Sequence, residues 1–114
     1  MNRNNTISIL NGHTDSVYGL KQITSDILSS ASVDKTTKLW NITSGTLIRT
    51  LSNHTNQIKW SLDLLNDGQT LVSGSYDQTI KYWNWTTRQV LKTIRTGYVI
   101  WSLAIISSKL IKIR

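Results

Sequence analysis

Cysteine, proline and glutamate are absent from this chain of 114 residues. Without cysteine there is no disulfide framework, no thiolate zinc site, no iron–sulfur cluster and no cysteine nucleophile. The two histidines leave little for metal chemistry, so the sequence predicts no metal ligands and no cofactor. Good helix formers are scarce, whereas threonine, serine, isoleucine, valine, tryptophan and tyrosine are abundant. This composition favours β-strands over helices.

Long hydrophobic runs are also missing. The longest mostly apolar stretch, residues 99–106, is interrupted by Ser102 and is far shorter than the ~18 residues of a membrane-spanning helix. Residues 1–10 contain only scattered apolar side chains, unlike the hydrophobic region of a secretory signal. The sequence therefore predicts an intracellular protein, cytoplasmic or nuclear, with no signal peptide, no transmembrane segment and no membrane partner.

What the chain does contain is an internal repeat, which decides the fold. The letters LSSASVDKTTKLWN, starting at Leu28, recur as LVSGSYDQTIKYWN from Leu71, 43 positions later. Upstream, His13 and His54 are 41 positions apart. The two-residue difference between this spacing and the spacing of 43 lies in one connector. A third, incomplete copy starts near Trp101. Within each copy, apolar and polar residues alternate with a period of two between turn signals, which is typical of an all-β domain.

The repeat resembles the WD40 family of β-propellers, in which Gly-His opens a unit and Trp-Asp closes it. Here the units run from Gly12-His13 to Trp40-Asn41 and from Asn53-His54 to Trp83-Asn84. Asn replaces the final Asp in both units. The resemblance implies a partial propeller with about two and a half four-stranded antiparallel blades over residues 1–114. Its parts are the outer strand of a preceding blade at 5–10, repeat 1 at 11–51, repeat 2 at 52–94 and a truncated, degenerate repeat 3 at 95–114.

The resemblance further implies a buried hydrogen-bond chain in each blade, formed by histidine, serine, aspartate and tryptophan. Strand parity does not distinguish the two serines available in each repeat. The implied residues are His13, Ser30 or Ser32, Asp34 and Trp40 in the first blade, and His54, Ser73 or Ser75, Asp77 and Trp83 in the second.

The same residues invite an enzymatic interpretation, with Ser30, His13 and Asp34 as a hydrolase triad. The set recurs one repeat later, and identical catalytic sites in adjacent repeats are not expected. A Gly-x-Ser-x-Gly elbow is also absent from the sequence. A structural role is favoured, and the sequence predicts no catalytic residues. His13 and His54 belong to different blades, so they are not expected to converge on a metal.

The net charge of +7 keeps nucleic acid open as a partner. Positive residues are concentrated near the C-terminus, and two aromatic residues among them have the size and shape to stack on bases. Elsewhere the charge is dispersed and much of the excess follows from the absence of glutamate, which favours an ordinary solvated surface. The cluster consists of Lys92, Arg95, Lys109, Lys112 and Arg114, with Tyr98 and Trp101 between them.

The function predicted from the resemblance is that of a non-catalytic scaffold that binds protein or peptide partners in a larger complex. RNA binding through the basic C-terminal part and a degenerate fragment without independent function are the alternatives. Two and a half blades do not close a ring. A piece of a larger propeller protein is the favoured explanation, and a degenerate copy and assembly of several copies are the others. Tyrosine and tryptophan are the residues most enriched in binding hot spots. The candidate partner-binding face consists of Tyr18, Val33, Trp60, Tyr76 and Trp101.

Overall fold

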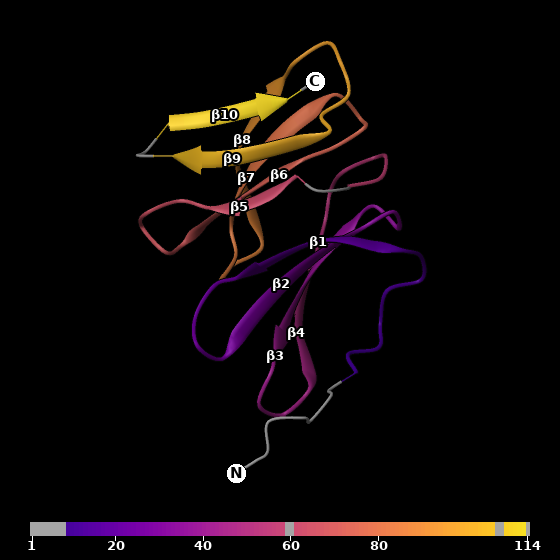
Figure 1. Ribbon diagram of the computed structural model, residues 1–114, viewed down its shortest axis with the longest axis vertical. Coiled ribbons are helices and arrows are strands. Elements are labelled where there is room, and N and C mark those ends of the chain that lie inside the picture. The colour runs from indigo at the N-terminus through magenta and orange to yellow at the C-terminus, as the bar shows by residue number, and fades with distance from the viewer. Residues whose placement is uncertain (1–8, 59–60, 107–108, 114) are drawn as a thin grey trace.

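The computed structural model describes residues 9–58, 61–106 and 109–113. Within these ranges every regular element is a β-strand, and the strands form three antiparallel sheets that stack on one another (Figure 1). The first blade contains β1 (Val17–Gln22), β2 (Ile27–Ser32), β3 (Thr36–Asn41) and β4 (Thr46–Ser52). The second contains β5 (Leu62–Leu64), β6 (Thr70–Gly74), β7 (Thr79–Asn84) and β8 (Gln89–Arg95). A hairpin of β9 (Ser102–Ile106) and β10 (Lys109–Ile113) follows.

The predicted all-β class and the antiparallel four-stranded blades are confirmed. The strand expected at residues 5–10 lies mostly outside the described residues, and Ile9 and Leu10 have no regular secondary structure. In the described part of the chain there is no helix long and apolar enough to cross a membrane.

The sequence repeat is reproduced in the strand register. Leu28 pairs with Trp40 between β2 and β3, and Leu71 pairs with Trp83 between β6 and β7. In both blades the pairing with the outermost strand shifts immediately before the tryptophan. Because a one-residue slip would turn every side chain to the opposite face, the shared register places equivalent residues of the two repeats on equivalent faces.

The turn between the second and third strands of each blade contains a residue in the left-handed region. Lys35 has a φ of 78° and Gln78 a φ of 71°, which is uncommon for residues other than glycine. Each turn is closed by a backbone hydrogen bond of 3.2 Å, from Lys35 N to Ser32 O and from Gln78 N to Ser75 O. The turn thereby holds the aspartate that precedes the left-handed residue.

The first hydrophobic cluster lies between the two blades. Ala31 and Leu39 of the first blade pack in it with Leu62, Leu71 and Trp83 of the second, and each of these residues is at most 7% exposed. The alternation of side chains along a strand explains this arrangement, since one face of each sheet meets the next sheet in the stack.

A second cluster joins the second blade to the hairpin. Val72 and Ile80 pack there with Ile100 and Leu103. The backbone of β6 approaches the hairpin so closely that a Cβ added at Gly74 would lie 2.5 Å from Ile100 Cγ2. Glycine at this position therefore sets the distance between the second blade and the hairpin.

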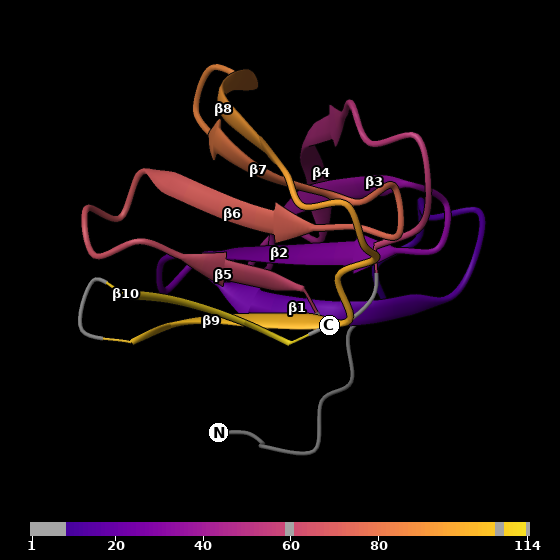
Figure 2. The same cartoon turned by 90° about the horizontal axis from the view of Figure 1, so that it is seen from above.

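One carboxylate connects all three sheets. Asp63 lies on β5, where its Oδ1 is 3.0 Å from Lys21 Nζ on β1 and its Oδ2 accepts a 2.7 Å hydrogen bond from the Ile105 backbone N–H on β9. The strands β1, β5 and β9 are neighbours along one side of the stack (Figure 2). Burial disfavours ionisation of Asp63, but the hydrogen bonds from the N–H groups of Ile105 and Leu64 and the Lys21 ammonium outweigh it and lower the pKa of the carboxyl.

One buried hydroxyl offers a test of the packing between the blades. Thr37 is fully buried, and its Oγ1 has no hydrogen-bond partner among the described residues. Ile80 occupies the equivalent position one repeat later. Thr37→Val should raise the free energy of unfolding by about 1–2 kcal/mol, because it removes an unsatisfied buried hydroxyl at almost constant volume. Chemical denaturation measures this gain.

Thr79→Val is the matched control, because the Thr79 hydroxyl donates to Asp77 Oδ1. This variant should lower the free energy of unfolding. A loss of stability in Thr37→Val would show that its hydroxyl has an acceptor, and would contradict the prediction.

Candidate functional site

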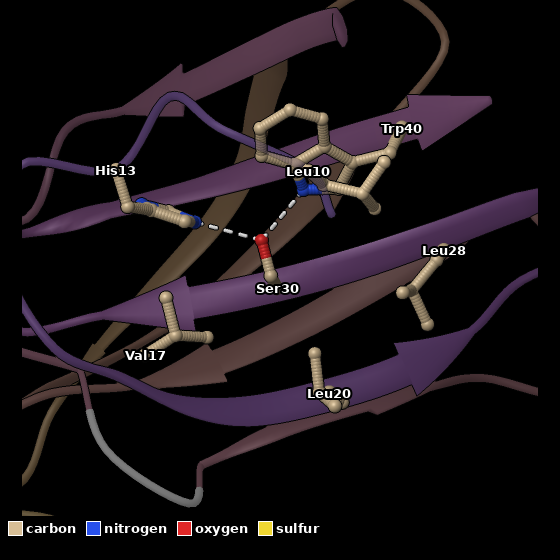
Figure 3. A pocket seen from close by; sticks show the side chains of 7 residues that line it. All are labelled: Leu10, His13, Val17, Leu20, Leu28, Ser30 and Trp40. Atoms are coloured by element: carbon tan, nitrogen blue, oxygen red, sulfur yellow. Dashed lines mark hydrogen bonds between the residues drawn. The ribbon is translucent and has the colours of Figure 1, made fainter. Parts of the chain in front are cut away.

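A chain of polar side chains crosses the first blade. His13 precedes β1, Ser30 lies on β2, Asp34 is in the following turn and Trp40 lies on β3. The Trp40 indole Nε1 is 2.8 Å from Ser30 Oγ, and His13 Nε2 is 2.7 Å from the same oxygen (Figure 3). On the other side of the imidazole ring, His13 Nδ1 is 2.7 Å from Asp34 Oδ2. The structure thus brings together four of the predicted residues.

Elementary donor and acceptor rules fix the direction of these hydrogen bonds. An indole only donates and a carboxylate only accepts, so Trp40 donates to Ser30 and His13 Nδ1 donates to Asp34. With the neutral imidazole proton on Nδ1, His13 Nε2 is an acceptor for the Ser30 hydroxyl. Every donor in the chain then has an acceptor, which is what burial of polar groups requires.

Of the two serines in each repeat, Ser30 and Ser73 take part in the chain. Ser32 instead closes the turn, because its hydroxyl donates to Ser16 O at 2.9 Å and its Oγ accepts the Asp34 N–H at 3.0 Å. Ser75 does the same in the second blade with Gln57 O and the Asp77 N–H, at 2.9 and 3.0 Å. The turn serine therefore fixes the backbone of the aspartate, while the chain serine contacts the side chains.

The second blade repeats this geometry to within 0.1 Å. The Trp83 indole Nε1 lies 2.8 Å from Ser73 Oγ, His54 Nε2 lies 2.7 Å from that oxygen, and His54 Nδ1 lies 2.8 Å from Asp77 Oδ2. The two copies differ in burial, because the Ser73 residue is fully buried while the first-blade chain borders an open pocket.

The aspartates at the ends of the two chains are held as carboxylates. Burial opposes ionisation of Asp34, but hydrogen bonds from the Thr36 side chain, His13 and the N–H groups of Thr14 and Thr36 outweigh it and lower its pKa to about 2. Burial also opposes ionisation of Asp77, but the equivalent donors, led by His54 and Thr79, outweigh it. They lower the pKa of Asp77 below its ordinary value of 3.8, and by more than the pKa of Asp34 is lowered.

This arrangement does not offer a nucleophile to a substrate. The Ser73 residue is fully buried and the Ser30 residue is only 4% exposed. Each serine oxygen also accepts an indole N–H and contacts a histidine ring nitrogen, so its hydrogen-bonding capacity is used within the blade. The two histidines bind residues of their own blades. In the part of the chain that the structure describes, no group of three histidine, cysteine, aspartate or glutamate residues is placed to hold a metal ion.

The predicted partner-binding residues lie along one edge of the stack, where strands of all three sheets begin or end. Tyr18 is near the start of β1, Val33 and Tyr76 follow the ends of β2 and β6, and Trp101 immediately precedes β9. In an antiparallel sheet the start of one strand and the end of its partner are at the same edge. We call these four residues the loop face. The fifth predicted residue, Trp60, lies outside the described residues.

The loop face contains an aromatic pair. The rings of Tyr76 and Trp101 meet edge to face with their centroids 5.3 Å apart and their planes at 61°. This pair bridges the second blade and the hairpin. Trp101 is 45% exposed and Tyr18 is 39% exposed, whereas Val33 is half-buried.

Two of the basic residues near the C-terminus lie over tyrosine rings. Lys112 Nζ lies 5.4 Å from the ring centroid of Tyr98, which itself packs against the second core cluster. Lys92, on β8, has its Nζ 5.9 Å from the ring centroid of Tyr82 on the neighbouring strand β7. Arg114 and the side chain of Lys109 are outside the described part. The interleaved basic and aromatic surface expected for RNA binding receives no support from this arrangement.

Two features were not identified from the sequence. One is the connection that Asp63 makes between three sheets. The repeat does not indicate it, because the first repeat has Lys21 at the equivalent position. The other is an open pocket of about 270 Å³ on the first blade, lined by His13, Ser30, Trp40 and four aliphatic residues (Figure 3). Its aliphatic residues have apolar, buried equivalents in the second repeat, so in the sequence they have the pattern of buried residues and not that of an open pocket.

Comparison with known proteins agrees with the repeat. Residues 4–41 and 45–84 match the family model of the WD domain, G-beta repeat. Coronin-7 of Rattus norvegicus is 35% identical to this chain over 68 residues, which cover 58% of this chain and 7% of coronin-7. Coronin-7 of Mus musculus is 34% identical over 68 residues, with the same shares covered. The match therefore spans less than a tenth of the length of these relatives.

Proposed function

Because this chain belongs to the WD domain, G-beta repeat family, we propose that it is a non-catalytic module that binds protein or peptide partners through its loop face. The family is generally non-catalytic and serves protein–protein interaction. In this proposal the blades form a rigid frame, and the two hydrogen-bond chains are structural. The absence of cysteine is consistent with an intracellular location.

The observation that carries the proposal is the Tyr76–Trp101 pair. Its edge-to-face contact holds both rings at the same edge of the stack, and almost half of the Trp101 surface is exposed. Rigid aromatic side chains are favoured in binding hot spots because they bury a large area at little cost in conformational entropy. A partner with an extended apolar or aromatic segment suits such a surface.

Selection of peptides on the intact chain tests the proposal. A random peptide display library should yield binders, and Trp101→Ala should weaken their binding about 30-fold or more, as removal of a hot-spot side chain does. Leu91→Ala is the matched control, because Leu91 is 52% exposed on β8, outside the loop face. It should leave peptide affinity unchanged. Thermal melting of each variant verifies that the blades remain folded.

Polyuridine RNA is the probe for the rival function. Binding of RNA that weakens steeply and log-linearly with salt, together with peptide binders that are insensitive to Trp101→Ala, would reject the loop face as the binding surface.

A further inference from the structure

The first blade lies at one end of the stack and the hairpin of β9 and β10 at the other (Figure 1). At one end, Val17, Leu20 and Leu28 of the first blade line the open pocket beside Trp40. Leu20 is 64% exposed and Val17 is 44% exposed. We call this surface the free blade face. Aliphatic side chains of this size on one sheet face are normally covered, since a blade buries its faces against its neighbours.

The internal repeat shows what covers such a face. The residues equivalent to Val17, Leu20 and Leu28 in the second blade are Ile58, Leu62 and Leu71, all at most 7% exposed. They are covered by the opposite face of the first blade, which presents Ala31 and Leu39. The natural occupant of the free blade face is therefore the apolar side of another β-sheet of this kind.

The hairpin at the other end of the stack presents such a side. Leu103, Ile105 and Leu110 pack toward the second blade. Ala104, Ile111 and Ile113 alternate with them and must face away from it. Ala104 pairs with Ile111 across the hairpin, so these residues form one patch. Ile111 is 36% exposed and Ile113 is 57% exposed. We call this patch the hairpin outer face.

We propose that copies of this chain associate head to tail, with the hairpin outer face of one copy docked on the free blade face of the next. The contact would repeat the kind of packing already present between the first and second blades. Ala104, Ile111 and Ile113 carry no charge, and neither do Val17, Leu20 and Leu28. Lys38, which pairs with Ser30 and so shares its face of the first blade, donates a hydrogen bond from its ammonium to Thr50 Oγ1 at 3.0 Å. Such a heterologous interface builds a closed ring or an open filament, depending on the rotation between copies.

Light scattering on the purified intact chain tests the proposal. Copies that associate should have a mass above the 12.9 kDa of one chain, and the mass should rise with concentration. Leu20→Asp breaks the free blade face and Ile113→Asp breaks the hairpin outer face. Each variant alone should remain at the mass of a single chain. Leu91→Asp places the same charge on β8, outside both faces, and should associate like the unaltered protein.

Mixing the two interface variants distinguishes head-to-tail contact from a symmetric one. Leu20→Asp retains an intact hairpin outer face, and Ile113→Asp retains an intact free blade face. An equimolar mixture should therefore form a pair with twice the mass of one chain and grow no further. Melting curves confirm that both variants are folded.

Three results would overturn the proposal. The unaltered chain could stay at the mass of one copy at all concentrations, the variants could associate as well as the unaltered chain, or the mixture could fail to pair. Failure of this proposal can be distinguished from failure of peptide binding at the loop face. Trp101→Ala replaces no residue of either docking surface, so this variant should still associate.

Discussion

Replacing Trp83 with alanine should lower the free energy of unfolding by about 3–5 kcal/mol, the range found for a large aromatic residue removed from a core. Trp83 is only 2% exposed and packs in the cluster between the two blades. Its loss leaves a cavity at this interface and removes the indole donor to Ser73. Chemical denaturation followed by circular dichroism measures the change.

Two further variants separate the contributions at this position. Trp83→Phe keeps most of the ring volume and loses the N–H donor, so its cost should be clearly smaller. Trp40→Ala removes the equivalent tryptophan of the first blade, which borders the open pocket, and should also cost less. Equal losses for Trp40→Ala and Trp83→Ala would contradict the conclusion that the second tryptophan is held by the contact between blades.

Asp77→Ala should lower the free energy of unfolding at neutral pH by about 2–4 kcal/mol. The carboxylate accepts hydrogen bonds from His54 Nδ1, the Thr55 N–H and both the N–H and the hydroxyl of Thr79. His54 and Thr79 are buried, and a buried donor without an acceptor costs about 1–3 kcal/mol. Denaturation at pH 7 measures this loss.

The effect of Asp77→Ala should depend on pH in a defined direction. The pKa of Asp77 in the folded state lies below its ordinary value of 3.8. The carboxyl therefore binds a proton more readily in the unfolded chain than in the folded protein. The contribution of Asp77 to stability is complete above pH 3.8 and is lost as the pH falls through the lower pKa of the folded state. The difference between Asp77→Ala and the unaltered chain should shrink progressively below pH 4 or so.

Asp67→Ala is the control for a carboxylate that accepts hydrogen bonds near the surface. Asp67 accepts from the N–H groups of Gln69 and Thr70 and from the Thr70 hydroxyl, but in an exposed turn where water can replace it. Asp67→Ala should lower the free energy of unfolding by less than Asp77→Ala does. A difference between Asp77→Ala and the unaltered chain that grows on acidification would refute the assigned direction.

The equivalence of the two blades was predictable because the sequence contains its own comparison. Two copies with matched residues indicate which positions are equivalent, and a period of two assigns them to opposite faces. The choice between Ser30 and Ser32 was not predictable, because both lie on the same face of β2. The fold decides it through the turn, where the backbone oxygen of Ser16 lies near Ser32 and the Trp40 indole lies near Ser30.

Contacts between sheets were harder to predict than contacts within them. The position of Asp63 between Lys21 and the Ile105 N–H depends on how three successive sheets are placed against one another, and the repeat pattern assigns residues only within a sheet. The first-blade pocket was missed for a related reason. Leu20 and Leu28 have the pattern of buried residues, and only the stack shows that no described element covers them.

The carboxylate of Asp63 also has a consequence for the order of events during synthesis. The Lys21 ammonium leaves the ribosome well before Asp63, and Asp63 well before Ile105. At about 5–20 residues per second, roughly 2–8 s separate each partner from the next, which is long compared with the formation of a hairpin. Until Asp63 has been synthesised, Lys21 on β1 therefore lacks its carboxylate partner. Asp63 connects all three sheets only once Ile105 has been synthesised as well. Slow translation between residues 64 and 105 would lengthen the interval in which a nascent chain has apolar surface accessible to chaperones or to other nascent chains.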